Sequence, residues 1–128
     1  MHPEPPRVLV VDDDADTCRN LADILDDAGY RADTVHDGPA ALALIRERPY
    51  RVTVLDYRMP GMDGLTVCRE IHKLRSGTVS IIVTAYAGQT SVEEFLNAGA
   101  SCVLAKPVDV GLLLETLSRL CGTPEVKP

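Results

Sequence analysis

The sequence predicts a single α/β domain in which helices cover both faces of a five-stranded parallel sheet. Five short apolar runs alternate with stretches of helical periodicity, as in successive βαβ units. Most runs are almost continuously apolar, which is typical of strands buried on both faces. The expected strands are Val8–Val11, Arg31–Val35, Val52–Leu55, Val79–Thr84 and Cys102–Ala105. A length of 128 residues suits one domain of this kind.

The second expected strand, Arg31–Val35, differs from the others because polar and apolar residues alternate along it. Such alternation indicates a half-exposed strand at an edge of the sheet. Between the strands, apolar residues recur at one-face helical spacing. They are Cys18, Leu21, Ala22 and Leu25, then Val67, Ile71 and Leu74, and finally Val110, Leu113, Leu114 and Leu117.

Short polar side chains that can cap a helix precede several of these stretches. The candidates are Asp14 or Asp16 for the first helix, Asp63 for the third, Ser91 for the fourth and Asp109 for the fifth. Glu94, three residues after Ser91, completes a capping-box pattern. Gly29 can end the first helix.

The expected domain spans residues 7–121, between the Pro-rich segments 1–6 and 122–128, which we interpret as tails or linker stubs. A composition of 45% hydrophobic and 25% charged residues is that of an ordinary soluble protein. No apolar run approaches the roughly 20 residues of a membrane span. The first residues also lack the layout of a signal peptide. We therefore expect a cytoplasmic protein without a membrane partner.

Charge and aromatic content argue against a nucleic-acid surface. The formal net charge is −6, Trp is absent, and Phe95 is the only Phe. No Cys lies at metal-ligand spacing from another Cys or from a His. We interpret all four as small core residues in a reducing compartment. They are Cys18, Cys68, Cys102 and Cys121.

Acidic residues close two of the expected strands. Asp12 and Asp13 follow the first strand, and Asp56 follows the third. Right-handed crossovers place these two strands side by side, so the three carboxylates should meet where the strand order reverses. Because they repel one another, the site calls for a divalent cation such as Mg²⁺.

Motifs at the ends of four of the five expected strands together resemble the receiver domain of bacterial response regulators. They are Asp12-Asp13, Asp56 within Leu55–Gly64, Thr84-Ala85, and Lys106-Pro107 within Gly99–Pro107. The resemblance covers about residues 7–120. It implies a flavodoxin-like three-layer sandwich with strand order 2-1-3-4-5, an order that comes from the family and not from the pattern alone.

The resemblance also implies roles for these residues. Asp56 would be the phosphoacceptor, and Asp13, Asp56 and the backbone carbonyl of Arg58 would bind Mg²⁺ directly, with Asp12 acting largely through a water. The phosphoryl oxygens would be contacted by Thr84 and Lys106. A small residue at Ala85 would leave the approach open, and the Lys106–Pro107 bond would be cis.

As a receiver, the chain would take a phosphoryl group from a histidine kinase or a histidine phosphotransfer protein. It would then switch an output domain or a protein target. It would catalyse its own phosphorylation and dephosphorylation without turning over a diffusible substrate, so it is not expected to be an enzyme in the usual sense.

The sequence departs from the family at Val103, where receivers usually carry Tyr or Phe. Valine has no ring to turn inward when Thr84 moves, so the usual threonine–aromatic coupling is in question. Tyr86 is the nearest aromatic that could replace it. Arg58 and Tyr86 also flank the expected pocket and could shield a phosphoaspartate from water. The stretch Ser91–Ala98 has no Lys or Arg, which disfavours the dimer of the transcription-factor type.

Other interpretations of the motifs stay open. Asp12-Asp13-Asp14 could be a solvated capping turn, and Lys106-Pro107 an ordinary surface turn. A haloacid dehalogenase-like phosphohydrolase would use an Asp-x-Asp pair, but Asp16 stands where that motif has Thr or Val. A phosphorylation-independent interaction module is a further alternative. A Rossmann nucleotide site is excluded because no Gly-rich fingerprint follows the first strand.

Overall fold

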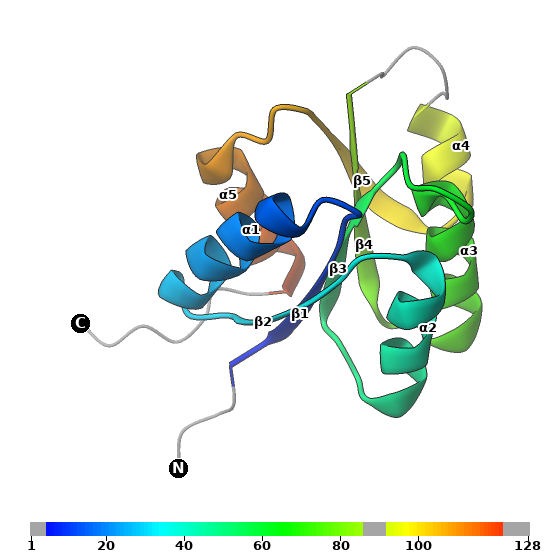
Figure 1. Cartoon of the computed structure of the whole chain (residues 1–128), viewed down its shortest axis with the longest axis horizontal. Helices are drawn as coiled ribbons and strands as arrows, with labels where there is room; N and C mark the ends of the chain where they lie inside the picture. The colour runs from blue at the N-terminus through cyan, green and yellow to red at the C-terminus, as the bar shows by residue number, and fades with distance from the viewer. Residues whose placement is uncertain (1–4, 86–91, 122–128) are drawn as a thin grey trace.

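The structure, a computed structural model, describes residues 5–85 and 92–121. Strands and helices alternate along the whole of this chain (Figure 1). In order they are β1 (Arg7–Val11), α1 (Ala15–Asp27), β2 (Arg31–Val35), α2 (Gly38–Glu47), β3 (Val52–Asp56), α3 (Gly64–Leu74), β4 (Val79–Thr84), α4 (Val92–Asn97), β5 (Ala100–Ala105) and α5 (Val110–Cys121).

The five strands form one parallel sheet in the order β2-β1-β3-β4-β5. This confirms the expected flavodoxin-like topology. The order reverses between β1 and β3, which are paired with Val11 opposite Leu55. The residues that follow Val11 and Leu55 therefore emerge side by side at the carboxyl edge of the sheet, in the crevice where open α/β sheets bind ligands.

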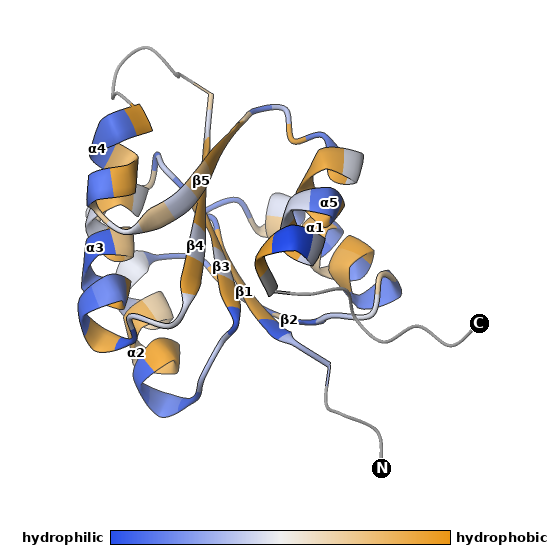
Figure 2. Ribbon diagram, turned by 180° about the vertical axis from the view of Figure 1, so that it is seen from behind, coloured by the Kyte–Doolittle hydropathy of each residue, from blue (hydrophilic) through white to orange (hydrophobic). Residues whose placement is uncertain are grey.

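Helices α1 and α5 cover one face of the sheet, and α2, α3 and α4 cover the other (Figure 1). Alternate residues of β1 serve the two faces. Val8 and Val10 pack in a core with residues of α1 and α5, and Leu9 and Val11 pack with residues of α2 and α3. The hydropathy colouring shows apolar residues concentrated on the central strands (Figure 2). The apolar strands are thus buried on both faces, as expected.

The edge strand and several helix boundaries also agree with the sequence. β2 lies at the edge and is only half-buried. Asp14, and not Asp16, is the N-cap of α1, because its side chain accepts bonds from the N–H groups of Asp16 and Thr17. Gly29 follows that helix with a φ of 98°.

The caps of the other helices are partly as predicted. Asp63 accepts a bond from the N–H of Thr66, and Asp109 one from the N–H of Leu112. The expected cap Ser91 lies outside the described residues. The cap of α2, Asp37, was not anticipated. β5 begins at Ala100, two residues before the predicted start at Cys102.

Cys18 and Cys68 are buried and Cys102 is half-buried, all as free thiols. The side chain of Cys121 is outside the described part. Within residues 5–85 and 92–121, every helix is too short or too polar to cross a bilayer.

Candidate functional site

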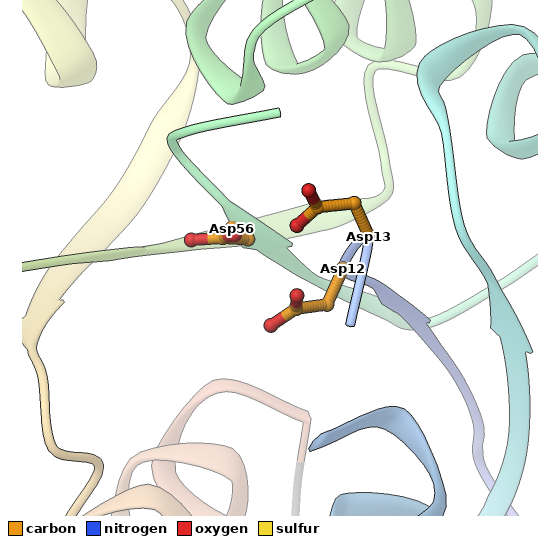
Figure 3. Close-up of side chains that lie close together, drawn as sticks. All are labelled: Asp12, Asp13 and Asp56. Carbon is orange, nitrogen blue, oxygen red and sulfur yellow. The ribbon is translucent and has the colours of Figure 1, made fainter. Parts of the chain in front are cut away.

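Three carboxylates converge at the carboxyl edge where β1 and β3 meet. One oxygen from each of Asp12, Asp13 and Asp56 lies within 4.8 Å of the others. Figure 3 shows the three side chains pointing toward the same side of the two strands. Residues about 43 positions apart are therefore brought together by the pairing of β1 with β3. A capping turn alone would not gather Asp56 with the other two.

The three acids differ in their exposure to solvent. Asp12 and Asp56 are only 5% and 6% exposed, whereas Asp13 is exposed. Burial raises the pKa of Asp12 above its usual range. The N–H of Asp14, which donates to Asp12 Oδ1 at 2.9 Å, opposes that shift, and the nearby charge of Asp56 adds to it. Ionising Asp12 beside Asp56 therefore costs free energy that a bound cation would offset.

Lys106 brings a positive charge to this cluster. Its Nζ lies 2.8 Å from Oδ1 of Asp56. Burial lowers the pKa of Lys106, but the hydrogen bond to Asp56 and the charges of Asp12 and Asp13 outweigh burial, so the net shift is upward. The ammonium group therefore stays protonated at neutral pH and offsets one of the three negative charges.

The strand register places Thr84 next to Lys106. Thr84 pairs with Ala105, and its carbonyl accepts a bond from the N–H of Lys106 at 2.9 Å. Thr84 is 2% exposed and ends β4, while Ala85 is exposed just beyond it. The Lys106–Pro107 peptide bond is cis, as expected.

The loop after Asp56 is held close to the strand end. The N–H of Tyr57 donates to the carbonyl of Val83, and the N–H of Gly64 donates to the carbonyl of Tyr57. A Cβ at Gly64 would lie 2.5 Å from the backbone oxygen of Asp56, so a side chain there would push this loop off the site. Arg58 is exposed and lines a hollow with Tyr57 and three further loop residues, Met59, Pro60 and Asp63.

The position where receivers usually carry an aromatic is filled by Val103, which is half-buried and packs against the core cluster that contains Phe95. Tyr86, the proposed substitute, lies outside the described residues. Sequence reasoning missed a different aromatic contact: Tyr57, directly after Asp56, meets Phe95 of α4 edge-on at a centroid distance of 5.1 Å.

His36 is a second residue near the site that sequence reasoning did not single out. Its ring is exposed, but Nδ1 lies 3.2 Å from the backbone carbonyl of Asp12. The signal that could have found it is topological: His36 directly follows β2, the neighbour of β1, so it emerges beside Asp12.

The donor set at this edge fits a magnesium ion. Mg²⁺ is a hard cation that takes oxygen ligands, often one or two carboxylates together with waters and phosphate oxygens. Asp12, Asp13 and Asp56 offer carboxylate oxygens. Neither Cys nor His belongs to this acidic group, so softer metals are not favoured.

Comparison with known proteins agrees with this fold. A sequence model of the response regulator receiver domain matches residues 8–118. The chain therefore belongs to the receiver domain family of response regulators, the family of two-component signalling.

Among curated proteins, the chain is 38% identical over 112 residues to the transcriptional regulatory protein ZraR of Salmonella typhimurium, a match that covers 88% of this chain and 25% of ZraR. It spans a quarter to about half of the length of the curated relatives it matches.

Solved structures show the same likeness. A CheY-like receiver domain protein from Methanospirillum hungatei JF-1 superposes with a TM-score of 0.86 and 33% identity, covering 90% of this chain and 92% of that one. The receiver domain of the sensor histidine kinase PA1611 from Pseudomonas aeruginosa PAO1 has a TM-score of 0.83 and 32% identity, covering 92% and 98%. That structure has a magnesium ion coordinated in its active site cleft.

Proposed function

We propose that this domain accepts a phosphoryl group on Asp56 from a phosphohistidine, in a reaction that depends on Mg²⁺. The observation that carries the proposal is the grouping of a buried Asp56 with two further acids and with the Lys106 ammonium 2.8 Å away. Family membership and the magnesium ion in the PA1611 receiver support it.

In the proposed reaction, an ionised oxygen of Asp56 attacks the phosphorus atom. A new O–P bond forms while the P–N bond to the donor imidazole breaks, which leaves an acyl phosphate on Asp56 and a free histidine on the donor. Lys106 exchanges its contact with Asp56 for a phosphoryl oxygen, and the hydroxyl of Thr84 donates to a second oxygen. Ala85 is small enough to leave the approach open.

The residues that would hold the metal are Asp13 and Asp56, together with the backbone carbonyl of Arg58, while Asp12 acts largely through a water. Bound Mg²⁺ would supply positive charge that offsets the negative charge of the phosphoryl group in the transition state. The carboxylates would orient the ion, and its positive charge would offset the repulsion among them.

The proposed partners are a histidine kinase or a histidine phosphotransfer protein as donor, and an output domain or a separate protein as target, with no nucleic acid bound directly. The unit that carries this chemistry is residues 7–121, acting in the cytoplasm. Its self-modification is a signalling step without turnover of a diffusible substrate. The transcriptional output of relatives such as ZraR is one candidate for the whole protein.

The proposal is tested by incubating the protein with acetyl phosphate, with and without Mg²⁺, followed by mass spectrometry. We expect one added phosphoryl group in the presence of Mg²⁺ and none in Asp56→Asn. Asp63→Asn is the matched control, because Asn also caps helices well and Asp63 caps α3. Phosphorylation of Asp56→Asn, or its absence in the native protein with Mg²⁺, would refute the proposal.

A further inference from the structure

The backbone of Asp12 is held by two separate segments of the chain, the end of β2 with the residue after it and helix α1. Its N–H donates to the carbonyl of Val35, the last residue of β2, at 3.2 Å. Its carbonyl accepts from Cys18 Sγ of α1 at 3.3 Å and faces His36 Nδ1 at 3.2 Å. The backbone that leaves β1 is therefore tied to β2 through the N–H of Asp12, and to His36 and α1 through its carbonyl.

The direction of the His36 bond follows from chemistry. A backbone carbonyl carries only lone pairs, so the ring nitrogen that faces it must carry the hydrogen. His36 thus donates from Nδ1 to Asp12. β2 ends at Val35, where its pairing with β1 also ends. Beyond that point the contact with the end of β1 is made by the side chain of the next residue, His36.

The carbonyl that His36 contacts belongs to the peptide bond between Asp12 and Asp13. A change in the ψ angle of Asp12 turns this carbonyl and moves Asp13 relative to Asp12. Hydrogen bonds that fix the carbonyl therefore limit how two of the three carboxylates in the acidic cluster are placed relative to one another. Cys18 is 1% exposed and cannot adjust its position without disturbing the core, whereas His36 reaches the carbonyl from the surface.

We propose that His36 is a positioning residue for the metal site: by holding the Asp12–Asp13 peptide in one orientation, together with Cys18, it keeps both carboxylates aimed at the ion. This inference rests on the proposed function, since it assumes that the acid cluster binds Mg²⁺. It assigns His36 no contact with the ion or with the phosphoryl group.

The test compares Mg²⁺ binding by calorimetry in the native protein, His36→Ala, His36→Asn and His72→Ala. The short amide of Asn can donate from about the place of Nδ1, so it should rescue the contact. His72 of α3 is an exposed histidine outside the acidic cluster, and its removal is the matched control. Acetyl phosphate labelling rates and melting temperatures are measured on the same samples.

We expect His36→Ala to raise the Kd for Mg²⁺ by roughly two- to tenfold, the range of one hydrogen bond. His36→Asn should bind nearly as the native protein does, and His72→Ala should be unchanged. If His36 had only a general structural role, His36→Ala would lower the melting temperature without this pattern of Kd values among the variants. Equal Kd values for His36→Ala and the native protein, or no rescue by Asn, would overturn the inference.

Should His36→Ala fold poorly, Cys18→Ala provides the second route, because it removes the other donor to the same carbonyl. If Cys18→Ala raises the Kd for Mg²⁺ by the same two- to tenfold, the orientation of the Asp12–Asp13 peptide controls the metal site. An unchanged Kd would count against this inference. If the native protein itself neither binds Mg²⁺ nor accepts a phosphoryl group, the proposed function has failed, and that result is distinct from a failure of the His36 inference.

Discussion

The two ends of the sheet differ in how their charged side chains are arranged. At the amino end of β1, Arg7 lies 3.8 Å from Asp33 of β2, and the hydroxyl of Tyr50 donates to the same carboxylate at 2.6 Å. At this end, the single carboxylate of Asp33 contacts one cation, Arg7, and one neutral donor, the hydroxyl of Tyr50. At the carboxyl end, three carboxylates gather around one ammonium group, that of Lys106.

This contrast shows that the fold does not impose the acidic cluster. Both ends are built on the same paired strands, β1 and its neighbours, so the difference comes from which side chains the sequence places near each end. Gathered like charges destabilise a fold unless something offsets them. An arrangement of like charges that destabilises the metal-free protein is what we expect of a binding site. The ion pair and hydrogen bond at the amino end, in contrast, are expected to stabilise the fold.

Removing the ammonium group should have the largest effect on stability. Lys106→Met leaves Asp56, which is 6% exposed, beside Asp12 without its cation. Breaking a buried pair can cost about 3–5 kcal/mol, and because Lys106 is one-third exposed we expect a loss of about 2 kcal/mol in the free energy of unfolding.

Urea denaturation measures this loss, with Lys73→Met as the matched control. Lys73 pairs with Glu70 at 3.3 Å on the surface and is 65% exposed, so its removal should cost at most about 0.5 kcal/mol. Equal losses in the two variants would show that Lys106 and Asp56 form only another surface pair.

Magnesium should stabilise the carboxyl end and leave the amino end unaffected. At ten times its Kd, Mg²⁺ should raise the free energy of unfolding by about 1.4 kcal/mol. Asp13→Asn should lose that gain and be more stable than the native protein without metal, because one repelling charge is gone. Asp23→Asn, at an exposed position of α1, should keep the full gain. A metal-free Asp13→Asn protein that is less stable than the native one would favour a capping turn instead.

The amino end should respond to a loss of hydrogen bonding without any response to metal. Tyr50→Phe removes the hydroxyl that donates to Asp33 but keeps the buried ring. We expect a loss of about 1 kcal/mol, the net value of one hydrogen bond, with the Mg²⁺ stabilisation unchanged. A Tyr50→Phe variant that also binds Mg²⁺ more weakly would mean that the two ends of the sheet are coupled.

The smallest effect concerns pH. Because Asp12 has a raised pKa in the folded protein, it binds its proton more tightly folded than unfolded. Its contribution to stability is therefore complete below its unfolded pKa and is lost as the pH rises through its folded pKa. The metal-free native protein should lose stability relative to Asp12→Asn over that interval, from about pH 4 upward.

Denaturation curves taken across pH measure this difference. Asn can still accept the bond from Asp14 through Oδ1, so the local geometry is kept. Saturating Mg²⁺ favours the ionised form and should suppress the difference. A gap between the two proteins that stays constant with pH would contradict the raised pKa of Asp12.

Much of the fold and of the acid cluster could be predicted from the sequence, because both depend on local patterns. Apolar runs predicted the strands, and acids at the carboxyl ends of neighbouring parallel strands were expected to meet at the carboxyl edge of the sheet. The contact of His36 with Asp12 could not be predicted in the same way, since it depends on the register of β2 with β1 and on the rotamer of an exposed ring.

Other misses have similar causes. The extension of β5 to Ala100 involves a shift in its register with β4 between Ser80 and Ile81, which no local pattern reveals. The ring contact between Tyr57 and Phe95 joins the loop after β3 to α4 across a large sequence separation.

The most direct test of the central claim, that the three carboxylates form one metal site, is a crystal structure grown with Mn²⁺ in place of Mg²⁺. Anomalous scattering locates the ion independently of the protein coordinates. We predict a single ion at the carboxyl edge of β1 and β3, about 2.1 Å from oxygens of Asp13 and Asp56. An empty edge at saturating Mn²⁺, or an ion bound only elsewhere on the surface, would contradict the account.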